Sequence, residues 1–191
     1  MTNKPVIIRG VTENWNTEKY WNLQAFYDRY KDVEFKVGED DDGRKIRIKL
    51  KYYLEYLIYN NDDSPLYLFE SSLESNKETK PIIDCYSVPK YFKDDLFSLA
   101  GERKRPPYRW LLIGPERSGT TVHIDPLYTS AWNTSLCGHK RWVLFPESVP
   151  KGIVKGYQYR RPGAEDEAIQ YFTDILPNIL KNEPAELLGA V

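Results

Sequence analysis

The chain has 191 residues, of which 41% are hydrophobic and 29% charged, and its formal net charge is −1 at pH 7. These values are typical of one globular domain with a real core, and they exclude a disordered composition. A net charge so close to zero gives no chain-wide attraction to nucleic acid or anionic lipid. No apolar stretch approaches the roughly 20 residues that a membrane span needs, so we expect no membrane association.

The N-terminus and the cysteines favour an intracellular protein. The apolar run at residues 5–8 meets Arg9 too early to hold a signal-peptide core. Cys85 and Cys137 fit no metal-binding spacing. A lone disulfide stays open, but buried free thiols in a reducing compartment are the simpler interpretation. The basic run 103–105 is typical of a solvated loop, with a nuclear targeting signal as the alternative.

The first part of the chain predicts a short strand, two helices and a hairpin. Residues 5–8 suggest the strand, and Asn22 can cap a helix with apolar positions Leu23, Phe26, Tyr27 and Tyr30. Alternating apolar residues predict strands over 33–37 and 46–50, joined by the acidic loop 38–43. That loop favours a solvated turn over a cation site. A second helix follows, with one apolar face made of Leu50, Tyr53, Leu54, Leu57 and Ile58.

The second part of the chain is rich in predicted strands. A short helix is expected over 94–99 and a longer one over 165–179. Strands are expected over 66–69, 110–113, 121–124, 129–136 and 140–145, with a turn at Gly138. Closely spaced strands with Gly and Pro between them favour a β-sandwich or barrel core wrapped by the earlier helices.

The strongest chemical signal is the tripeptide His123-Ile124-Asp125. Side chains alternate along a strand, so His123 and Asp125 point to one face and Ile124 to the other. An imidazole nitrogen beside a carboxylate oxygen supplies two thirds of the 2-His-1-carboxylate triad that holds iron(II) and leaves open positions. By itself the tripeptide is a weak signal, because an ordinary hydrogen-bonded pair has the same pattern.

The surrounding sequence is more specific. Residues 108–127 read YRWLLIGPERSGTTVHIDPL, residues 129–133 read TSAWN, and residues 138–146 read GHKRWVLFP. Upstream, residues 64–69 read SPLYLF, residues 88–92 read VPKYF, and residues 5–10 read PVIIRG. With these motifs nearly the whole chain resembles the Jumonji C (JmjC) iron(II)- and 2-oxoglutarate-dependent oxygenases. Within that family it is most similar to the branch of bifunctional arginine demethylases and lysyl hydroxylases.

The resemblance implies a mainly β fold with flanking helices, built as a double-stranded β-helix of the cupin-like or jelly-roll kind. It implies a single domain over residues 1–191. In it, residues 1–60 are helical and hairpin support, and residues 61–191 are the first part of the β-helix core. We expect this β-helix to be incomplete at the C-terminus and to lack its last strands.

The resemblance also assigns the site. It gives His123 and Asp125 to iron(II), and Thr120, Asn133, Lys140 and Tyr67 to the pocket of the cosubstrate 2-oxoglutarate. A buried dicarboxylate needs a cation and neutral donors, which these residue types supply. Each also has a plainer interpretation: Lys140 as a surface lysine, Asn133 as a turn residue and Tyr67 as core packing.

The sequence departs from the family in its histidines and at Tyr128. The family's third iron ligand is a histidine in a downstream Gly-Trp-Trp-His type segment, but this chain has only His123 and His139, and His139 is expected to be structural. Residues 183–188 resemble the segment that leads to the missing strand, so we expect a truncated chain. If another ligand replaces the histidine, the candidates are Glu165, Asp166, Glu167 and the C-terminal carboxylate. Tyr128 stands where the branch has glycine.

Three functions remain open. The first is a JmjC oxygenase that hydroxylates lysine or demethylates methylarginine in a protein substrate, such as a histone or an RNA-processing protein, in the nucleus or otherwise the cytoplasm. The second is a non-catalytic binding or regulatory fragment, and the third is a cupin-like metal binder. Open sheet edges also predict self-association. Whether the 191-residue chain is active stays open.

Overall fold

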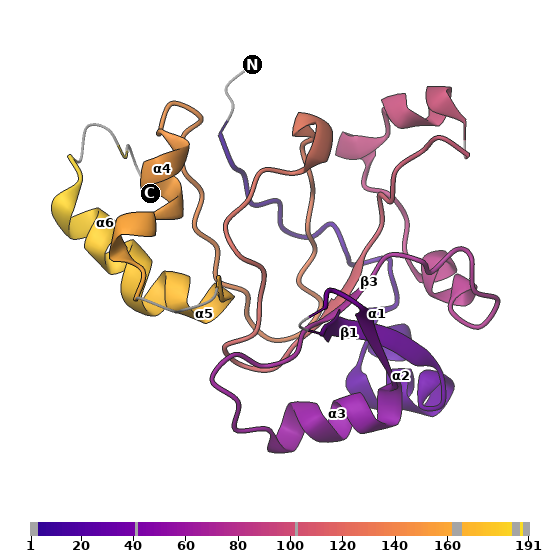
Figure 1. Cartoon of the computed structure of the whole chain (residues 1–191). Helices are drawn as coiled ribbons and strands as arrows, with labels where there is room; N and C mark the ends of the chain where they lie inside the picture. Colours follow the sequence, from indigo (N-terminus) through magenta and orange to yellow (C-terminus); the bar gives the residue numbers. More distant parts are fainter. Residues whose placement is uncertain (1–3, 41, 102, 162–165, 185–187, 189–191) are drawn as a thin grey trace. The chain divides into compact units, whose positions relative to one another are not determined.

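The computed structural model describes residues 4–40, 42–101, 103–161, 166–184 and 188 (Figure 1). They form two compact units. The first unit comprises Val6–Asn60 and Leu66–Pro115, and the second comprises Asn61–Pro65 and Glu116–Val191 together with Met1–Pro5. The expectation of a single domain stays a prediction.

Among its described residues, the first unit holds three α-helices, three 3₁₀ turns and two small sheets. Its regular elements are α1 (Thr17–Tyr20), α2 (Leu23–Tyr30), β1 (Glu34–Glu39), β2 (Lys45–Lys49), α3 (Leu50–Tyr59), β3 (Leu68–Glu70), β4 (Leu111–Ile113) and the short 3₁₀ turns Lys80–Cys85, Lys90–Phe92 and Leu96–Ala100. The helix expected over 94–99 is thus a 3₁₀ turn. The Asn22 cap is confirmed, since its side-chain oxygen accepts from the N–H of Ala25 at 2.8 Å.

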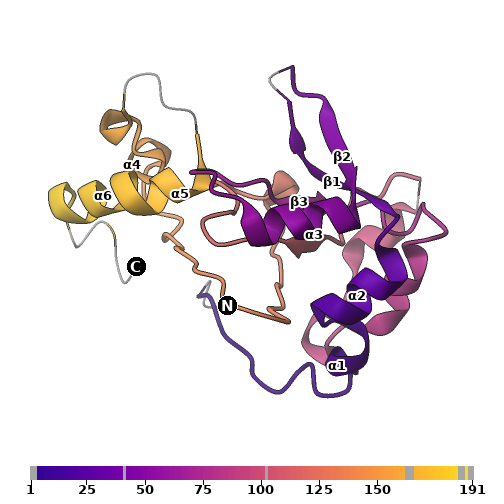
Figure 2. The ribbon, with the colours of Figure 1, turned by 90° about the horizontal axis from the view of Figure 1, so that it is seen from below.

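The predicted hairpin is confirmed. β1 and β2 pair antiparallel with Phe35 opposite Ile48, and a bulge falls between Lys36 and Gly38. In Figure 2 the free end of this hairpin extends away from α2 and α3. The Asp40 carboxylate accepts from the N–H of Arg44 at 2.7 Å, so the acidic loop is a turn closed by its own side chain.

The core of the first unit lies where α2 and α3 pack on the strands. Its buried residues include Phe26, Phe35, Val37, Leu50, Tyr53, Leu68 and Leu111. β3 and β4 pair antiparallel, with Leu68 opposite Ile113. The apolar face expected for the second helix packs against this core from Leu50 through Leu57, while Ile58 is exposed.

The second unit is a helical cluster with extended segments packed on it. It contains η4 (Pro126–Tyr128), α4 (Lys151–Lys155), η5 (Tyr157–Tyr159), α5 (Ala168–Gln170), the π turn η6 (Tyr171–Ile175) and α6 (Leu176–Asn182). Figure 1 shows α4 in orange beside α5 and α6 in yellow. Pro177 cannot donate to the carbonyl four residues earlier, which accounts for the π turn before it. The core consists of Val149, Tyr171, Ile175, Leu176, Ile179 and Leu188.

Several expected strands are not formed. Residues 121–124, 129–136 and 140–145 belong to no ladder in the described chain, and residues 5–8 lack regular structure. Val122, Val143 and Phe145 pack their side chains against the helical core instead. The described residues form two sheets of two antiparallel strands each, and these do not make up a double-stranded β-helix. A strand is stable only where another strand supplies partners for its backbone groups.

Both cysteines are free thiols, but neither is fully buried as expected: Cys85 is half-buried and Cys137 is exposed. No helix within the described ranges is long and apolar enough to span a membrane.

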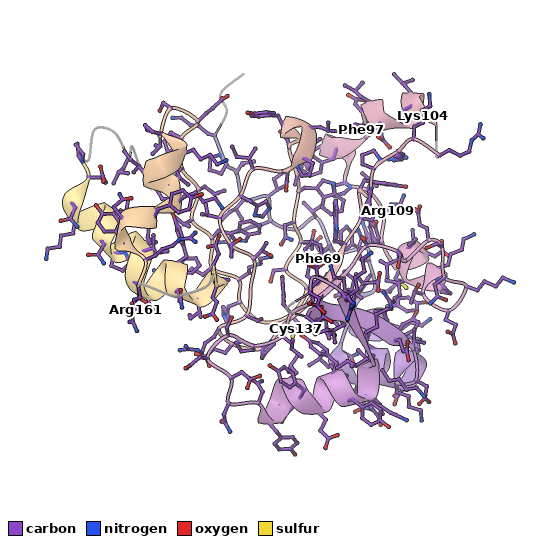
Figure 3. All side chains as sticks on the ribbon, viewed as in Figure 1. Phe69, Phe97, Lys104, Arg109, Cys137 and Arg161 are labelled. Carbon is purple, nitrogen blue, oxygen red and sulfur yellow. The ribbon has the colours of Figure 1, made fainter. Side chains whose placement is uncertain are left out.

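The basic run is a solvated loop at Lys104, which extends outward in Figure 3. Arg105 instead forms an ion pair with Asp95 and lies 3.4 Å from the ring centroid of Tyr108.

Candidate functional site

The candidate site lies on the extended segment 121–125 of the second unit. Val122 packs against the helical core, whereas the side chain of His123 is half exposed. This segment follows Arg117, whose guanidinium donates to the backbone carbonyl of Asp63 at 3.1 Å. The alternation expected from the sequence is present at Val122 and His123. It breaks at Ile124, which is 67% exposed rather than packed beside Val122, and no second strand pairs with the segment among the described residues.

His123 and Asp125 converge, as their spacing predicts. His123 Nδ1 lies 2.7 Å from the backbone carbonyl of Thr121, and Nε2 lies 3.2 Å from Asp125 Oδ1. A carbonyl can only accept, so the proton of the neutral imidazole belongs on Nδ1. In the neutral ring the Nε2 lone pair then faces a carboxylate oxygen, and either a proton on Nε2 or a metal cation between the two atoms stabilises the pair.

The pair fits two positions of a metal site. Two ligands at right angles on an octahedral ion with bonds of roughly 2.1 Å would stand about 3.0 Å apart, close to the observed 3.2 Å. Nitrogen and carboxylate donors are also the facial set that iron(II) takes. Within the described ranges, no group of three or more His, Cys, Asp or Glu residues surrounds a common point. These residues therefore fit two ligand positions and supply no third.

A tight turn fixes the far side of the pair. The N–H of Tyr128 donates to the carbonyl of Asp125 at 3.2 Å, and Pro126 opens the turn. Leu127 and Tyr128 have φ of 60° and 54°, a region that favours glycine. The extended backbone thus ends at Asp125, and the residue that stands in place of the branch's glycine adopts a glycine-like conformation.

The residues assigned to 2-oxoglutarate belong to both units: Tyr67 to the first, and Thr120, Asn133 and Lys140 to the second. Thr120 and Asn133 are exposed, and Tyr67 is half-buried in the first unit, where burial raises the pKa of its phenol. The ammonium of Lys140 lies 4.6 Å from the ring centroid of Trp142. This partial loss of solvent lowers the pKa of Lys140, even though much of its side chain is exposed. Their roles stay predictions.

Of the replacement ligands considered above, the two in the described ranges, Asp166 and Glu167, do not join the pair. Asp166 is engaged by Arg160 at 2.9 Å and lies 3.9 Å from the ammonium of Lys155. Glu165 and the C-terminal carboxylate lie outside the described residues. His139 is exposed, and its structural role stays a prediction.

One contact near the pair carries no signal in the sequence. The ammonium of Lys155 donates to the backbone carbonyl of Val122 at 2.5 Å, across 33 positions of sequence. Neither a motif nor a periodicity links the two residues, so only the packing of α4 reveals the contact.

Comparison with known proteins gives consistent matches. A family model described as "Cupin-like domain" matches residues 1–169. The chain is 48% identical over 175 residues to "Bifunctional arginine demethylase and lysyl-hydroxylase psr-1" of Caenorhabditis elegans, covering 92% of this chain and 44% of that protein. It is 40% identical over 151 residues to "Lysine-specific demethylase JMJ21" of Arabidopsis thaliana, covering 78% and 16%.

A more distant relative is "2-oxoglutarate and iron-dependent oxygenase JMJD4" of Danio rerio. The identity is 27% over 164 residues, covering 75% of this chain and 38% of that protein. The chain spans less than half the length of each of these relatives.

Proposed function

Because this chain belongs to the cupin-like domain family, we propose that it is part of an iron(II)- and 2-oxoglutarate-dependent protein oxygenase. The observation that carries the proposal is the convergence of His123 Nε2 and Asp125 Oδ1 at 3.2 Å. The names of the relatives support the reaction class, since they include a lysyl hydroxylase, demethylases and a 2-oxoglutarate- and iron-dependent oxygenase.

His123 and Asp125 would hold the metal through Nε2 and Oδ1. When bound, iron(II) with 2-oxoglutarate and dioxygen supplies the oxidising chemistry that hydroxylates a carbon of the substrate. The carbonyl of Thr121 keeps the proton on Nδ1, so that Nε2 is the atom that binds. Hydroxylation of a lysyl side chain ends at the alcohol, whereas hydroxylation of an N-methyl group on arginine releases formaldehyde.

Lys140 would bind a carboxylate of 2-oxoglutarate, with Thr120, Asn133 and Tyr67 as neutral donors. The partial desolvation of Lys140 supports this role, because a charge-assisted bond is stronger where less water competes. The raised pKa of Tyr67 keeps its phenol protonated and able to donate.

The finer fold is also a proposal. We infer that residues 121–124, 129–136 and 140–145 are strands of a double-stranded β-helix whenever other strands pair with them. The apolar alternation of these segments supports this, as does the cupin-like family match. Until they are paired, their backbone groups can join another chain, so self-association belongs to the same proposal.

A protein substrate and a nuclear location complete the proposal. The relatives' names specify arginine and lysine as targets, which supports a protein substrate such as a histone or an RNA-processing protein. The exposed basic residues Arg103 and Lys104 are available to a nuclear import receptor.

Metal binding by the 191-residue chain tests this function directly. Mn(II), a redox-stable substitute for iron(II), can be titrated and the free ion followed by electron paramagnetic resonance. His123→Ala and Asp125→Ala should each remove the binding, because each deletes one of two described ligands. His139→Ala is the matched control, since it removes the chain's other histidine. Binding that survives in both site variants would refute the proposed centre.

The second candidate is a cupin-like fragment that binds a partner without turnover. It is favoured by the absence of a third metal-ligating residue beside the pair in the described ranges. Succinate formation from 2-oxoglutarate separates the two functions. Turnover that depends on His123 would rule out the non-catalytic fragment, which would give none.

A further inference from the structure

Lys155 approaches the metal-binding segment from the helical core. Its ammonium donates to the carbonyl of Val122 at 2.5 Å, and its side chain is 18% exposed. The carbonyl that it holds belongs to the peptide bond joining Val122 to His123. Any rotation of that peptide group therefore changes the direction in which His123 leaves the backbone.

The helix end that carries Lys155 is itself firmly held. The Tyr171 hydroxyl donates to the carbonyl of Val154 at 2.6 Å. Gly156 ends the helix with φ of 54°, and a Cβ there would lie 2.3 Å from Ile175 Cγ2. Only glycine allows so close an approach, so the end of α4 is fixed against the core of the second unit.

The charges around Lys155 favour this arrangement. Its ammonium lies 3.9 Å from the Asp166 carboxylate, which is also paired with Arg160 at 2.9 Å. A lysine in the last turn of a helix can simply bond the carbonyls of its own helix. Lys155 instead donates to a residue 33 positions earlier, so the bond joins the core to the candidate site.

We propose that Lys155 is a positioning residue for the metal-binding imidazole of His123. Its bond and the packing of Val122 hold the 122–123 peptide from two sides. The carbonyl of Thr121 then stays in reach of Nδ1, and Nε2 stays directed at Asp125. The proposal rests on the proposed function for its purpose, but the placement of the ring can be measured without metal.

Two variants separate positioning from packing. Lys155→Met keeps the aliphatic stem and loses the donor, while Lys155→Arg keeps a cationic donor. Lys151→Met, at an exposed position of the same helix, is the matched control. Should Lys155→Met not fold, Lys155→Gln takes its place, because its side chain is too short to reach Val122.

The first measurement is the nitrogen-15 spectrum of the metal-free His123 ring. Wild type and Lys155→Arg should show the Nδ1–H tautomer, and Lys155→Met should show a mixture of tautomers. The second is Mn(II) affinity, which should fall about tenfold in Lys155→Met, the typical loss when a group that orients a metal ligand is removed, and return in Lys155→Arg.

The outcomes distinguish this inference from the proposed function. An unchanged tautomer in Lys155→Met means that the Lys155 bond does not position the ring, whatever the metal affinity. A changed tautomer in a protein that binds no Mn(II) supports the positioning and overturns the metal site. A tautomer change in Lys151→Met as well would mean a general loosening of α4 and would overturn the inference.

Discussion

The hydroxyl of Tyr53, in the middle of α3, donates to the backbone carbonyl of Ile113 in β4 at 2.5 Å. The same hydroxyl accepts from the N–H of Leu68 in β3 at 3.0 Å. One fully buried side chain thus joins a helix to both strands of a sheet. Burial raises the pKa of this phenol, which keeps its proton in place for donation.

Removing this hydroxyl should destabilise the first unit. Tyr53→Phe leaves the carbonyl of Ile113 and the N–H of Leu68 buried with a lost partner, at a cost of about 1–3 kcal/mol. Urea unfolding followed by tryptophan fluorescence measures it. Tyr52→Phe, at the exposed neighbouring position, should leave the unfolding midpoint unchanged. Equal midpoints for both variants would show that the Tyr53 bonds contribute nothing net.

Glu70 should make the first unit sensitive to acid. Glu70 is 4% exposed, and its carboxylate accepts from the N–H of Ser72 at 2.9 Å and from the guanidinium of Arg47 at 2.8 Å. Burial alone raises the pKa of Glu70, but the hydrogen bonds of Ser72 and Lys36 and the charge of Arg47 hold it below its ordinary 4.5. A lowered folded-state pKa stabilises the fold above the unfolded-state pKa, and this stabilisation is lost as pH falls through the folded-state value.

The test compares Glu70→Gln with wild type at several pH values. At pH 7 the variant should lose about 2 kcal/mol of unfolding free energy, the worth of a hydrogen bond to a charged group. The difference should shrink as pH falls below 4.5. Glu39→Gln, in an exposed pair with Lys36, is the control. A difference that stays constant with pH would assign the loss to packing rather than to charge.

Lys140 should control the affinity for 2-oxoglutarate. Lys140→Ala removes the cation and should weaken binding about ten- to hundredfold, whereas Lys140→Arg should retain most of it. Desolvation lowers the pKa of Lys140 below the ordinary lysine value of 10.5. As pH rises, Lys140 should therefore lose its charge, and the affinity for 2-oxoglutarate should fall, before the pH reaches 10.5. Calorimetry with Mn(II) present measures both effects. Equal affinity in wild type and Lys140→Ala would place Lys140 outside the cosubstrate pocket.

Tyr128 should carry backbone strain beside Asp125. Its φ of 54° costs a residue with a Cβ about 1 kcal/mol, so Tyr128→Gly should raise the melting temperature by roughly 2–4 °C. Tyr128→Ala removes the same ring, which is 82% exposed, but keeps the Cβ. If alanine stabilises as much as glycine, the ring rather than the backbone is the cause.

Local patterns predicted local structure well. Asn22 identified the start of α2, and the apolar alternation around Phe35 and Ile48 identified the hairpin, because each depends on neighbours close in sequence. The same alternation failed over 129–145, because a strand exists only when a distant segment pairs with it. His123 and Asp125 could be recognised for a local reason, their separation by one residue. Lys155 could not, since its contact depends on how α4 packs.

Residues 129–145 form no helix or strand, and this has a consequence for digestion by proteases. A protease takes its substrate in extended form and needs a run of backbone that is not held in a helix or sheet. This stretch offers such a run, with Lys140 and Arg141 as sites for trypsin. A nick there should leave α4 through α6 in a single C-terminal fragment, so a brief digest followed by mass spectrometry would map the boundary of the helical core.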